Sequence, residues 1–222
     1  MEIYVVKIQD FYEEKLNKLC LLVTEESRNR IERFLRRQDK IRTLVGEVLI
    51  RMIACEKLNL RNDDIVFYKN PYGKPYLKSN QEFYFNISHS GDFVVAAIDN
   101  GEVGIDTEQV VWIEDYMGIA QKYFAEAEFT YIESGACDSL SRFYEIWTAK
   151  ESYIKCTGKG LSIPLKSFSI KAEGGNIRTI TDGKGKEYVF KQFNIDAGYK
   201  LTVCSLGGSI PDAVSIVNQN SL

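Results

Sequence analysis

The stretch FVVAAIDNGEVGIDTE, residues 93–108, joins two apolar runs through a short polar turn. The runs Phe93 to Ile98 and Val103 to Ile105 are typical of strands that are buried in a core. The dipeptide Asn100-Gly101 between them is a strong hairpin signal, because both central residues of a type I′ turn need positive φ. We therefore predict an antiparallel hairpin in which Phe93 faces Glu108.

Long helices are expected on both sides of this stretch. Between about Arg42 and Leu58 the apolar residues recur at three- and four-residue spacing, which is typical of a helix that packs one face on a core. A second such helix is expected from about Leu140 to Cys156. The other expected elements are a strand at 3–6, a helix that starts at Thr24, a helix at 114–128, strands at 168–171, 177–180, 187–193 and 199–205, and turns at 174–175, 182–183 and 197–198.

The order of these elements is similar in the two halves of the chain, since each half has a long helix, Gly/Pro-rich turns and antiparallel strands. This order predicts an α+β fold of two similar subdomains related by a pseudo-twofold axis, each with a long helix packed on a small antiparallel sheet. The junction is expected near Gly101, with an N-terminal subdomain at 1–101 and a C-terminal subdomain at 102–222. A site would lie in the cleft between them.

Composition limits the classes of function. The 222 residues are 45% hydrophobic with a formal net charge of −3, so neither nucleic acid nor an anionic membrane surface is an expected partner. No apolar run is long enough to span a bilayer, and no signal-peptide pattern follows Met1. We expect a cytoplasmic protein.

The cysteine and histidine counts exclude several kinds of site. The five cysteines are scattered, odd in number and without CxxC spacing, which disfavours a disulfide framework and a zinc site. Buried, reduced thiols are expected instead. With His89 as its single histidine, the chain has no His-rich metal site and no two-histidine mechanism.

Asp106 and Glu108 are candidate metal ligands. They are two residues apart, so on a strand both carboxylates project from one face while Ile105 and Thr107 point to the other. A pair of hard oxygen ligands suits magnesium, which commonly shares one or two carboxylates with substrate phosphates. Taken alone, the same pattern also fits a solvated strand face.

A second group of charges lies on the expected C-terminal helix. Trp147, Glu151 and Lys155 follow one another at four-residue spacing and therefore share a face. The simple interpretation is a surface ion pair beside a core tryptophan. The tryptophan, however, indicates that this face is partly buried, where charges need a partner such as a metal or a phosphate.

A third group could form an anion cradle. His89 lies between two hydroxyl residues, Ser88 and Ser90, and Lys74 brings a cation from a turn that Pro75 stiffens. His89 could equally be a loop histidine without a ligand. A basic cluster on the expected N-terminal helices could be a solvated face for the most part, but it also offers a place where a polyphosphate could bind. Its members are Arg28, Arg30, Arg33, Arg36, Arg37 and Arg42.

Four motifs in order make the sequence similar to a known family, the Sfp-type phosphopantetheinyl transferases. The similarity extends over most of the chain and includes Arg42-Thr43-Leu44 and the segment 158–161. The motifs are YGKP at 72–75, FNISHS at 85–90, GIDTE at 104–108 and WTAKESYIK at 147–155.

The resemblance implies a monomer that binds coenzyme A and Mg²⁺ between two similar halves. It implies that Asp106, Glu108 and Glu151 hold the metal. It also implies nucleotide contacts from Arg42, Thr43, Lys74, Pro75, Ser88 and His89, and pyrophosphate contacts from Lys150 and Lys155. Two departures from the family pattern are Thr148, where serine is frequent, and Ser27, where lysine is frequent and one phosphate contact is therefore in doubt.

The implied activity is transfer of 4′-phosphopantetheine from coenzyme A to a serine of an apo carrier protein, with Glu151 and Lys155 as catalytic residues. The docking surface for the carrier could include residues 116–124, although these could also pack inside. Three other readings stay open from the residues alone: a coenzyme A or carrier-binding module without catalysis, a magnesium-dependent nucleotide hydrolase, and a purely structural protein.

Overall fold

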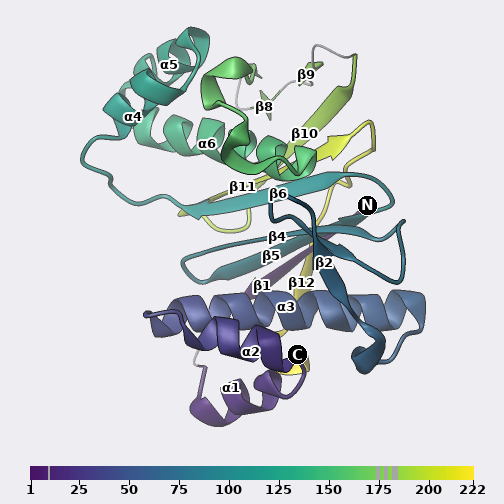
Figure 1. Ribbon diagram of the computed structural model, residues 1–222. Coiled ribbons are helices and arrows are strands. Elements are labelled where there is room, and N and C mark those ends of the chain that lie inside the picture. The colour runs from purple at the N-terminus through teal and green to yellow at the C-terminus, as the bar shows by residue number, and fades with distance from the viewer. Residues whose placement is uncertain (10, 174–175, 178–179, 182–184) are drawn as a thin grey trace.

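The computed structural model of the chain describes residues 1–9, 11–173, 176–177, 180–181 and 185–222. Two four-stranded sheets are stacked between helix α6 on one side and helix α3 on the other (Figure 1). The strands are β1 (Glu2–Lys7), β2 (Phe67–Lys69), β3 (Pro75–Leu77), β4 (Tyr84–Ser90), β5 (Phe93–Asp99), β6 (Val103–Gln109), β7 (Ala172–Glu173), β8 (Asn176–Ile177), β9 (Ile180–Thr181), β10 (Glu187–Phe193), β11 (Tyr199–Leu206) and β12 (Ser215–Val217). The α-helices are α1 (Glu13–Cys20), α2 (Glu25–Glu32), α3 (Arg37–Leu58), α4 (Tyr116–Tyr123), α5 (Glu126–Glu133) and α6 (Ser139–Thr157).

The first sheet has the strand order β12-β1-β5-β4 and is covered by α3. The apolar stripe predicted for this helix is present, and Leu44, Val45 and Val48 are fully buried against Val94 and other residues of the sheet. The helix starts five residues earlier than the periodicity suggested. Thr24 caps α2 as predicted, because its side chain accepts a hydrogen bond from the Ser27 amide.

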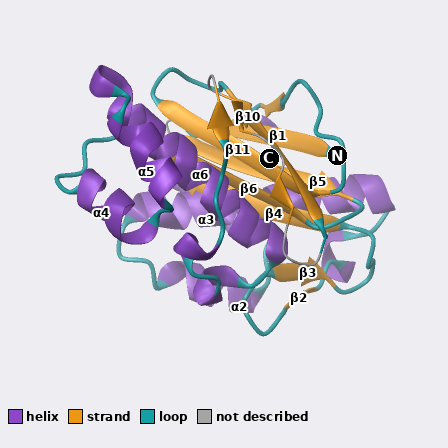
Figure 2. Ribbon diagram, turned by 90° about the horizontal axis from the view of Figure 1, so that it is seen from above, coloured by secondary structure: helices purple, strands orange, loops and turns teal. Residues whose placement is uncertain are grey.

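The second sheet has the strand order β6-β11-β10-β9, and α6 packs along β6 and β11 (Figure 2). The helix ends at Thr157, and the next residue, Gly158, has a φ of +66°, the left-handed conformation that favours glycine. Between the two sheets lies a third apolar layer, to which Val95 and Ala97 contribute from β5 and Ile105 from β6. The alternation predicted for β6 is therefore correct.

The predicted hairpin of residues 93–108 is wrong, although both strands exist. β5 pairs with β1 and β4, and β6 pairs with β11, so the turn at Asn100-Gly101 carries the chain from one sheet to the other. Neither turn residue has positive φ. The physical reason is that both faces of β5 are apolar, so β5 fits best in the middle of a sheet that is covered on both sides.

Two other predicted elements also differ. The helix expected at 114–128 is broken after Tyr123, because the buried Phe124 is extended and the Glu128 carboxylate accepts a 2.7 Å hydrogen bond from the Ala125 amide, which starts α5. Residues 168–171 are not a strand, since β7 begins only at Ala172. The turns expected at 174–175 and 182–183, and the middle of the strand expected at 177–180, lie outside the described residues.

The α+β class is confirmed, with mostly antiparallel sheets and six α-helices among the described residues. One pairing is parallel and joins the two ends of the chain, since β12 lies beside β1. The division of the chain at residue 101 into two similar subdomains stays a prediction. No helix of the described chain has the length and apolarity that a membrane crossing requires.

Candidate active site

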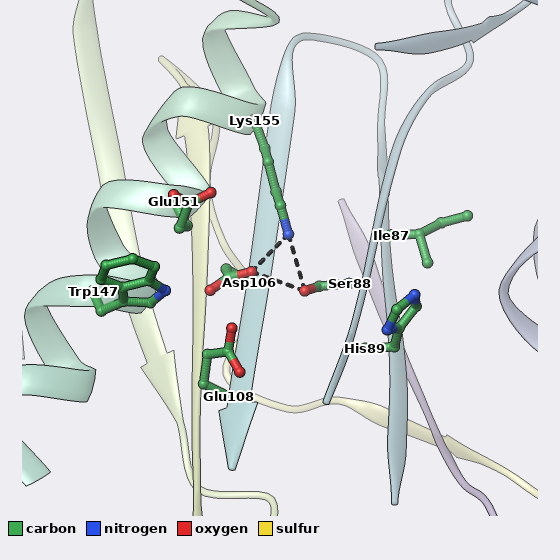
Figure 3. A pocket seen from close by; sticks show the side chains of 8 residues that line it. All are labelled: Ile87, Ser88, His89, Asp106, Glu108, Trp147, Glu151 and Lys155. Atoms are coloured by element: carbon green, nitrogen blue, oxygen red, sulfur yellow. Dashed lines mark hydrogen bonds and ion pairs between the residues drawn. The ribbon is translucent and has the colours of Figure 1, made fainter. Parts of the chain in front are cut away.

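A cavity of about 360 Å³ opens between α6 and the strands β4 and β6 (Figure 3). It brings together charged residues from three of the sequence motifs, because β4 and β6 belong to different sheets whose edges meet under α6. Its walls are formed by Ile87, Ser88, His89, Asp106, Glu108, Trp147, Glu151 and Lys155.

Side chains, rather than a backbone ladder, join β4 to β6. Alternate residues of β4 accept hydrogen bonds from alternate amides of β6 and so satisfy backbone groups that would otherwise lack partners. The bonds run from Ile105 N to Asn86 Oδ1 (2.9 Å), from Thr107 N to Ser88 Oγ (3.3 Å) and from Gln109 N to Ser90 Oγ (3.0 Å). These three hydrogen bonds hold the edge of β4 against the edge of β6.

Asp106 is the most deeply placed acid of the cavity and is 3% exposed. Its Oδ1 accepts hydrogen bonds from Ser88 Oγ at 2.8 Å and from Lys155 Nζ at 2.6 Å, and these three residues form a closed triangle (Figure 3). Its Oδ2 is buried and has no partner within the described part of the chain. A buried carboxylate oxygen without a partner is costly, and a cation would satisfy it.

The two other acids are half-buried. Burial, together with the nearby Asp106 carboxylate, raises the pKa of Glu108 to about 7. The same two causes raise the pKa of Glu151, and Lys155 opposes them. Figure 3 shows the Glu108 carboxylate on β6 directed toward Asp106, and Glu151 on α6 at the wall of the same cavity. The cavity therefore holds more negative charge than its lysine can balance.

These carboxylate oxygens are the type of ligand that magnesium prefers, but they do not form a complete coordination site. Among the residues described, no group of three or more His, Cys, Asp or Glu side chains is arranged so that it could hold a metal ion. Magnesium keeps several waters and usually takes only one or two carboxylates beside substrate phosphates, so a finished cage is not required. The unpartnered Asp106 Oδ2 is the observation that favours a cation here.

A second, larger cavity of about 710 Å³ lies next to the first and shares Ile87 and His89 with it. Arg42, Thr43 and Pro75 line it, as the resemblance implied for a nucleotide site. His89 points away from the carboxylates, on the side of β4 opposite to Ser88 (Figure 3). It stays exposed at the rim, but its crowded surroundings and Arg42 lower its pKa.

Lys74 does not fit the predicted role in phosphate binding. Its side chain is buried, and its ammonium group donates to the Glu102 carboxylate and to the carbonyl oxygens of Val103 and Cys156. The neighbouring Pro75 lines the larger cavity, whereas the Lys74 ammonium is held between β6 and the end of α6. In this structure Lys74 ties elements together.

Lys150 also does not lie where a contact with the pyrophosphate was predicted. It is 0% exposed and forms an ion pair of 2.8 Å with the buried Glu128 of α5. Its ammonium also donates to the carbonyl oxygens of Leu165 and Phe168, each at 2.9 Å. The structure therefore places Lys150 inside the fold, away from the cavity that Lys155 and Glu151 line.

Sequence reasoning also missed one contact. The sequence places the Ser90 hydroxyl in a possible anion cradle, whereas in the structure this hydroxyl donates a 2.8 Å hydrogen bond to the carboxylate oxygen Glu108 Oε2. A signal was present, because Asn86, Ser88 and Ser90 form a period-two row of small polar residues on one face of β4.

Comparisons with known proteins show the family of the chain. Residues 12–100 match the family model described as the N-terminal part of 4′-phosphopantetheinyl transferase, and residues 102–204 match that of the 4′-phosphopantetheinyl transferase superfamily. The chain is 34% identical to 4′-phosphopantetheinyl transferase ffp of Bacillus subtilis, with 100% of both chains covered. It is 37% identical to the gsp enzyme of Aneurinibacillus migulanus over 95% of this chain and 88% of that one. It is 32% identical to Sfp of Bacillus subtilis strain 168 over 100% of both.

The mixed α+β fold is consistent with that of a phosphopantetheinyl transferase. The chain belongs to the 4′-phosphopantetheinyl transferase superfamily, and the resemblance drawn from the four motifs is confirmed. Enzymes of this family move the phosphopantetheine group of coenzyme A to a carrier protein.

Proposed function

We propose that this chain transfers 4′-phosphopantetheine from coenzyme A to the serine hydroxyl of an apo carrier protein and releases adenosine 3′,5′-bisphosphate, with Mg²⁺ as cofactor. The observation that carries the assignment of the site is the buried, unpartnered Oδ2 of Asp106 beside Glu108, Glu151 and Lys155. A transfer of this kind asks a protein mainly for positioning and for neutralisation of charge.

Asp106 would hold the magnesium ion through its free oxygen, with Glu108 and Glu151 as further oxygen donors. The ion would neutralise charge on the pyrophosphate when it is bound. The pKa values of Glu108 and Glu151 are raised by burial and then by the nearby Asp106 carboxylate, and a divalent cation among the three acids would relieve the repulsion between them.

Lys155 would act on the phosphate groups of coenzyme A, and Glu151 would act on the attacking serine hydroxyl. The Lys155 ammonium sits at the cavity wall on α6, bonded to Asp106 and Ser88, and from there it can neutralise a phosphate oxygen. Glu151 lies one helical turn away, and its raised pKa makes it a better proton acceptor for the attacking serine hydroxyl.

The nucleotide half of coenzyme A would occupy the larger cavity. Arg42 and Thr43 from α3 and Pro75 from β3 line it, and His89 stands between it and the acidic cavity. A ligand with an adenine nucleotide at one end and a pyrophosphate in the middle can therefore span both cavities. Lys74 and Lys150 are left out of this assignment, because their ammonium groups are bonded inside the fold.

Several finer parts of the proposal concern the whole protein. We infer that the chain acts as a monomer in the cytoplasm, and that two subdomains, 1–101 and 102–222, form the walls of the site. The proposed partners are coenzyme A and an acyl or peptidyl carrier protein, with neither nucleic acid nor membrane involved.

The test is intact-mass analysis of a small panel of apo carrier proteins incubated with coenzyme A, with and without Mg²⁺. We expect a mass increase equal to one phosphopantetheine, and only with the divalent ion. Asp106→Asn, which keeps the size of the side chain, should lower the rate on the order of 10³-fold, or about 4 kcal/mol of transition-state stabilisation.

Two outcomes would contradict the proposal. A near-normal rate for Asp106→Asn at saturating Mg²⁺ would remove the metal assignment. Release of free phosphopantetheine without modification of any carrier would instead indicate a hydrolase that uses the same acids with water as the nucleophile.

A further inference from the structure

Two serines of β4 make the same arrangement of contacts, two residues apart. Ser88 Oγ accepts from the Thr107 amide and donates to Asp106 Oδ1 at 2.8 Å. Ser90 Oγ accepts from the Gln109 amide at 3.0 Å and donates to Glu108 Oε2 at 2.8 Å. Each hydroxyl thus connects a backbone amide of β6 to the carboxylate of the residue before it.

Ser90 itself does not line the acidic cavity, so any effect on the reaction passes through Glu108. A glutamate side chain has several rotatable bonds, and Glu108 lies near the end of β6. Without an anchor its carboxylate would sample several positions. The hydrogen bond from Ser90 selects one of them on the side of Asp106.

The backbone that carries Ser90 is held firmly on its far side. Ser90 pairs with Phe93 across the tight turn at Gly91-Asp92. The Gly91 carbonyl accepts a 2.7 Å hydrogen bond from Arg42 Nη1, and the Asp92 amide donates a 2.9 Å hydrogen bond to Tyr199 Oη.

Gly91 itself cannot be replaced without disturbing this turn. Its φ is +52°, and a Cβ atom there would lie 2.1 Å from Tyr199 Oη, so the close approach of the turn to Tyr199 requires glycine. The Ser90 hydroxyl is consequently presented by a fixed turn rather than by a free strand end.

We propose that Ser90 is a positioning residue that holds the Glu108 carboxylate in place for the divalent cation, an inference that rests on the proposed function. The partners of metal-binding carboxylates typically change metal affinity by 10- to 100-fold when they are removed. The loss of the Ser90 hydroxyl should therefore weaken cation binding without removing any ligand of the cation.

Asn86 offers a matched control on the same strand. It accepts a 2.9 Å hydrogen bond from the Ile105 amide, as Ser90 does from Gln109, but within the described residues it bonds to neither Asp106 nor Glu108. Asn86→Ala and Ser90→Ala therefore each leave one β6 amide without its acceptor. Only the second removes a donor to a carboxylate. Ser90→Thr keeps the hydroxyl and a side chain that suits a strand.

The experiment measures Mn²⁺ binding by electron paramagnetic resonance to the full chain saturated with coenzyme A, in the absence of carrier protein. Manganese prefers the same oxygen ligands as magnesium. Ser90→Ala should raise the Mn²⁺ dissociation constant about 10-fold. Ser90→Thr and Asn86→Ala should bind like the wild type. A thermal unfolding curve of each variant serves as the control that it is folded at the temperature of the measurement.

A second readout is the Mg²⁺ dependence of transfer. Ser90→Ala should raise the Mg²⁺ concentration for half-maximal rate by a similar factor and keep kcat at saturating Mg²⁺. The inference is overturned if Ser90→Ala binds Mn²⁺ as the wild type does, or if Asn86→Ala weakens binding equally. If the wild type itself binds no Mn²⁺, the metal assignment of the proposed function fails instead, and this inference falls with it.

Discussion

The two sides of helix α6 hold buried charge in opposite ways. On one side Lys150 is fully buried, and its ammonium finds the Glu128 carboxylate and two carbonyl oxygens within hydrogen-bonding distance. On the other side Asp106 keeps a buried oxygen without a partner, and Glu108 and Glu151 are crowded around it.

This difference separates the charged groups that stabilise the fold from those that are available to bind a ligand. Glu128 is satisfied twice more, since its two oxygens accept from the amides of Ala125 and Ile170. A closed network of this kind stabilises one arrangement of the chain, whereas an open one keeps its binding capacity for another molecule. Burial raises the pKa of Glu108 and Glu151 and lowers the pKa of Lys150, but Glu128 opposes the shift at Lys150.

The strongest test of this contrast compares Lys155→Ala with Lys150→Met. The first variant removes the cation that faces the cavity and should lower kcat/KM on the order of 10²- to 10³-fold at a temperature where it is fully folded. The second should keep most of the activity at a temperature where it is fully folded. Carrier modification followed by mass spectrometry measures both. If the two folded variants lose activity equally, Lys150 takes part in the reaction, and the difference drawn between the two sides of α6 is wrong.

The next test addresses the closed network itself. Glu128→Ala leaves the Lys150 ammonium buried without its carboxylate, which should lower the free energy of unfolding by about 3 kcal/mol, or roughly 10 °C in thermal midpoint. Lys150→Met should also destabilise the chain, and the double variant Glu128→Ala/Lys150→Met should lose less than the sum of the single changes. Denaturant unfolding of the four proteins gives the coupling energy. Additive losses would mean that the pair is not a coupled unit.

The smallest expected effect concerns His89, which lies between the two cavities. Its pKa is lowered by its crowded surroundings and by Arg42 and Lys155, with Asp39 opposing them. Between this lowered value and the ordinary 6.5, the unfolded chain binds more protons than the folded one. The contribution of His89 to stability should therefore be lost as the pH falls from about 7.5 to 5.5. The raised pKa values of Glu108 and Glu151 act in the opposite direction but are present in both proteins, so His89→Gln should become more stable relative to the wild type as the pH falls. Thermal midpoints across this range measure the difference, and parallel curves for the two proteins would exclude the effect.

Much of the candidate site could be predicted from local pattern. The two-residue spacing of Asp106 and Glu108 and the four-residue spacing of Trp147, Glu151 and Lys155 each place side chains on one face of a strand or helix. The structure brings these residues to one cavity. Their roles as metal ligands and catalytic groups stay predictions.

Other parts were out of reach because they depend on contacts between distant segments. The break after Tyr123 depends on the ring of Phe124, which stacks on Phe143 at 5.6 Å between centroids, and on the cap from Glu128. The positions of Lys74 and Lys150 depend on carbonyl oxygens that lie far away in the sequence. A lysine side chain is long and flexible, so the neighbouring sequence does not predict where its ammonium group lies.

The sequence by itself determined the chemistry of the side chains and the face of each element on which they lie, because helices and strands have fixed periods. Only the tertiary structure decided which edges meet. The apolar run of β5 predicted a buried strand but not that β1 and β4 would be its neighbours, because strand patterning specifies faces and leaves the pairing partner to packing. This pairing places Ser88 and Ser90 against β6, where their hydroxyls donate to the carboxylates of Asp106 and Glu108.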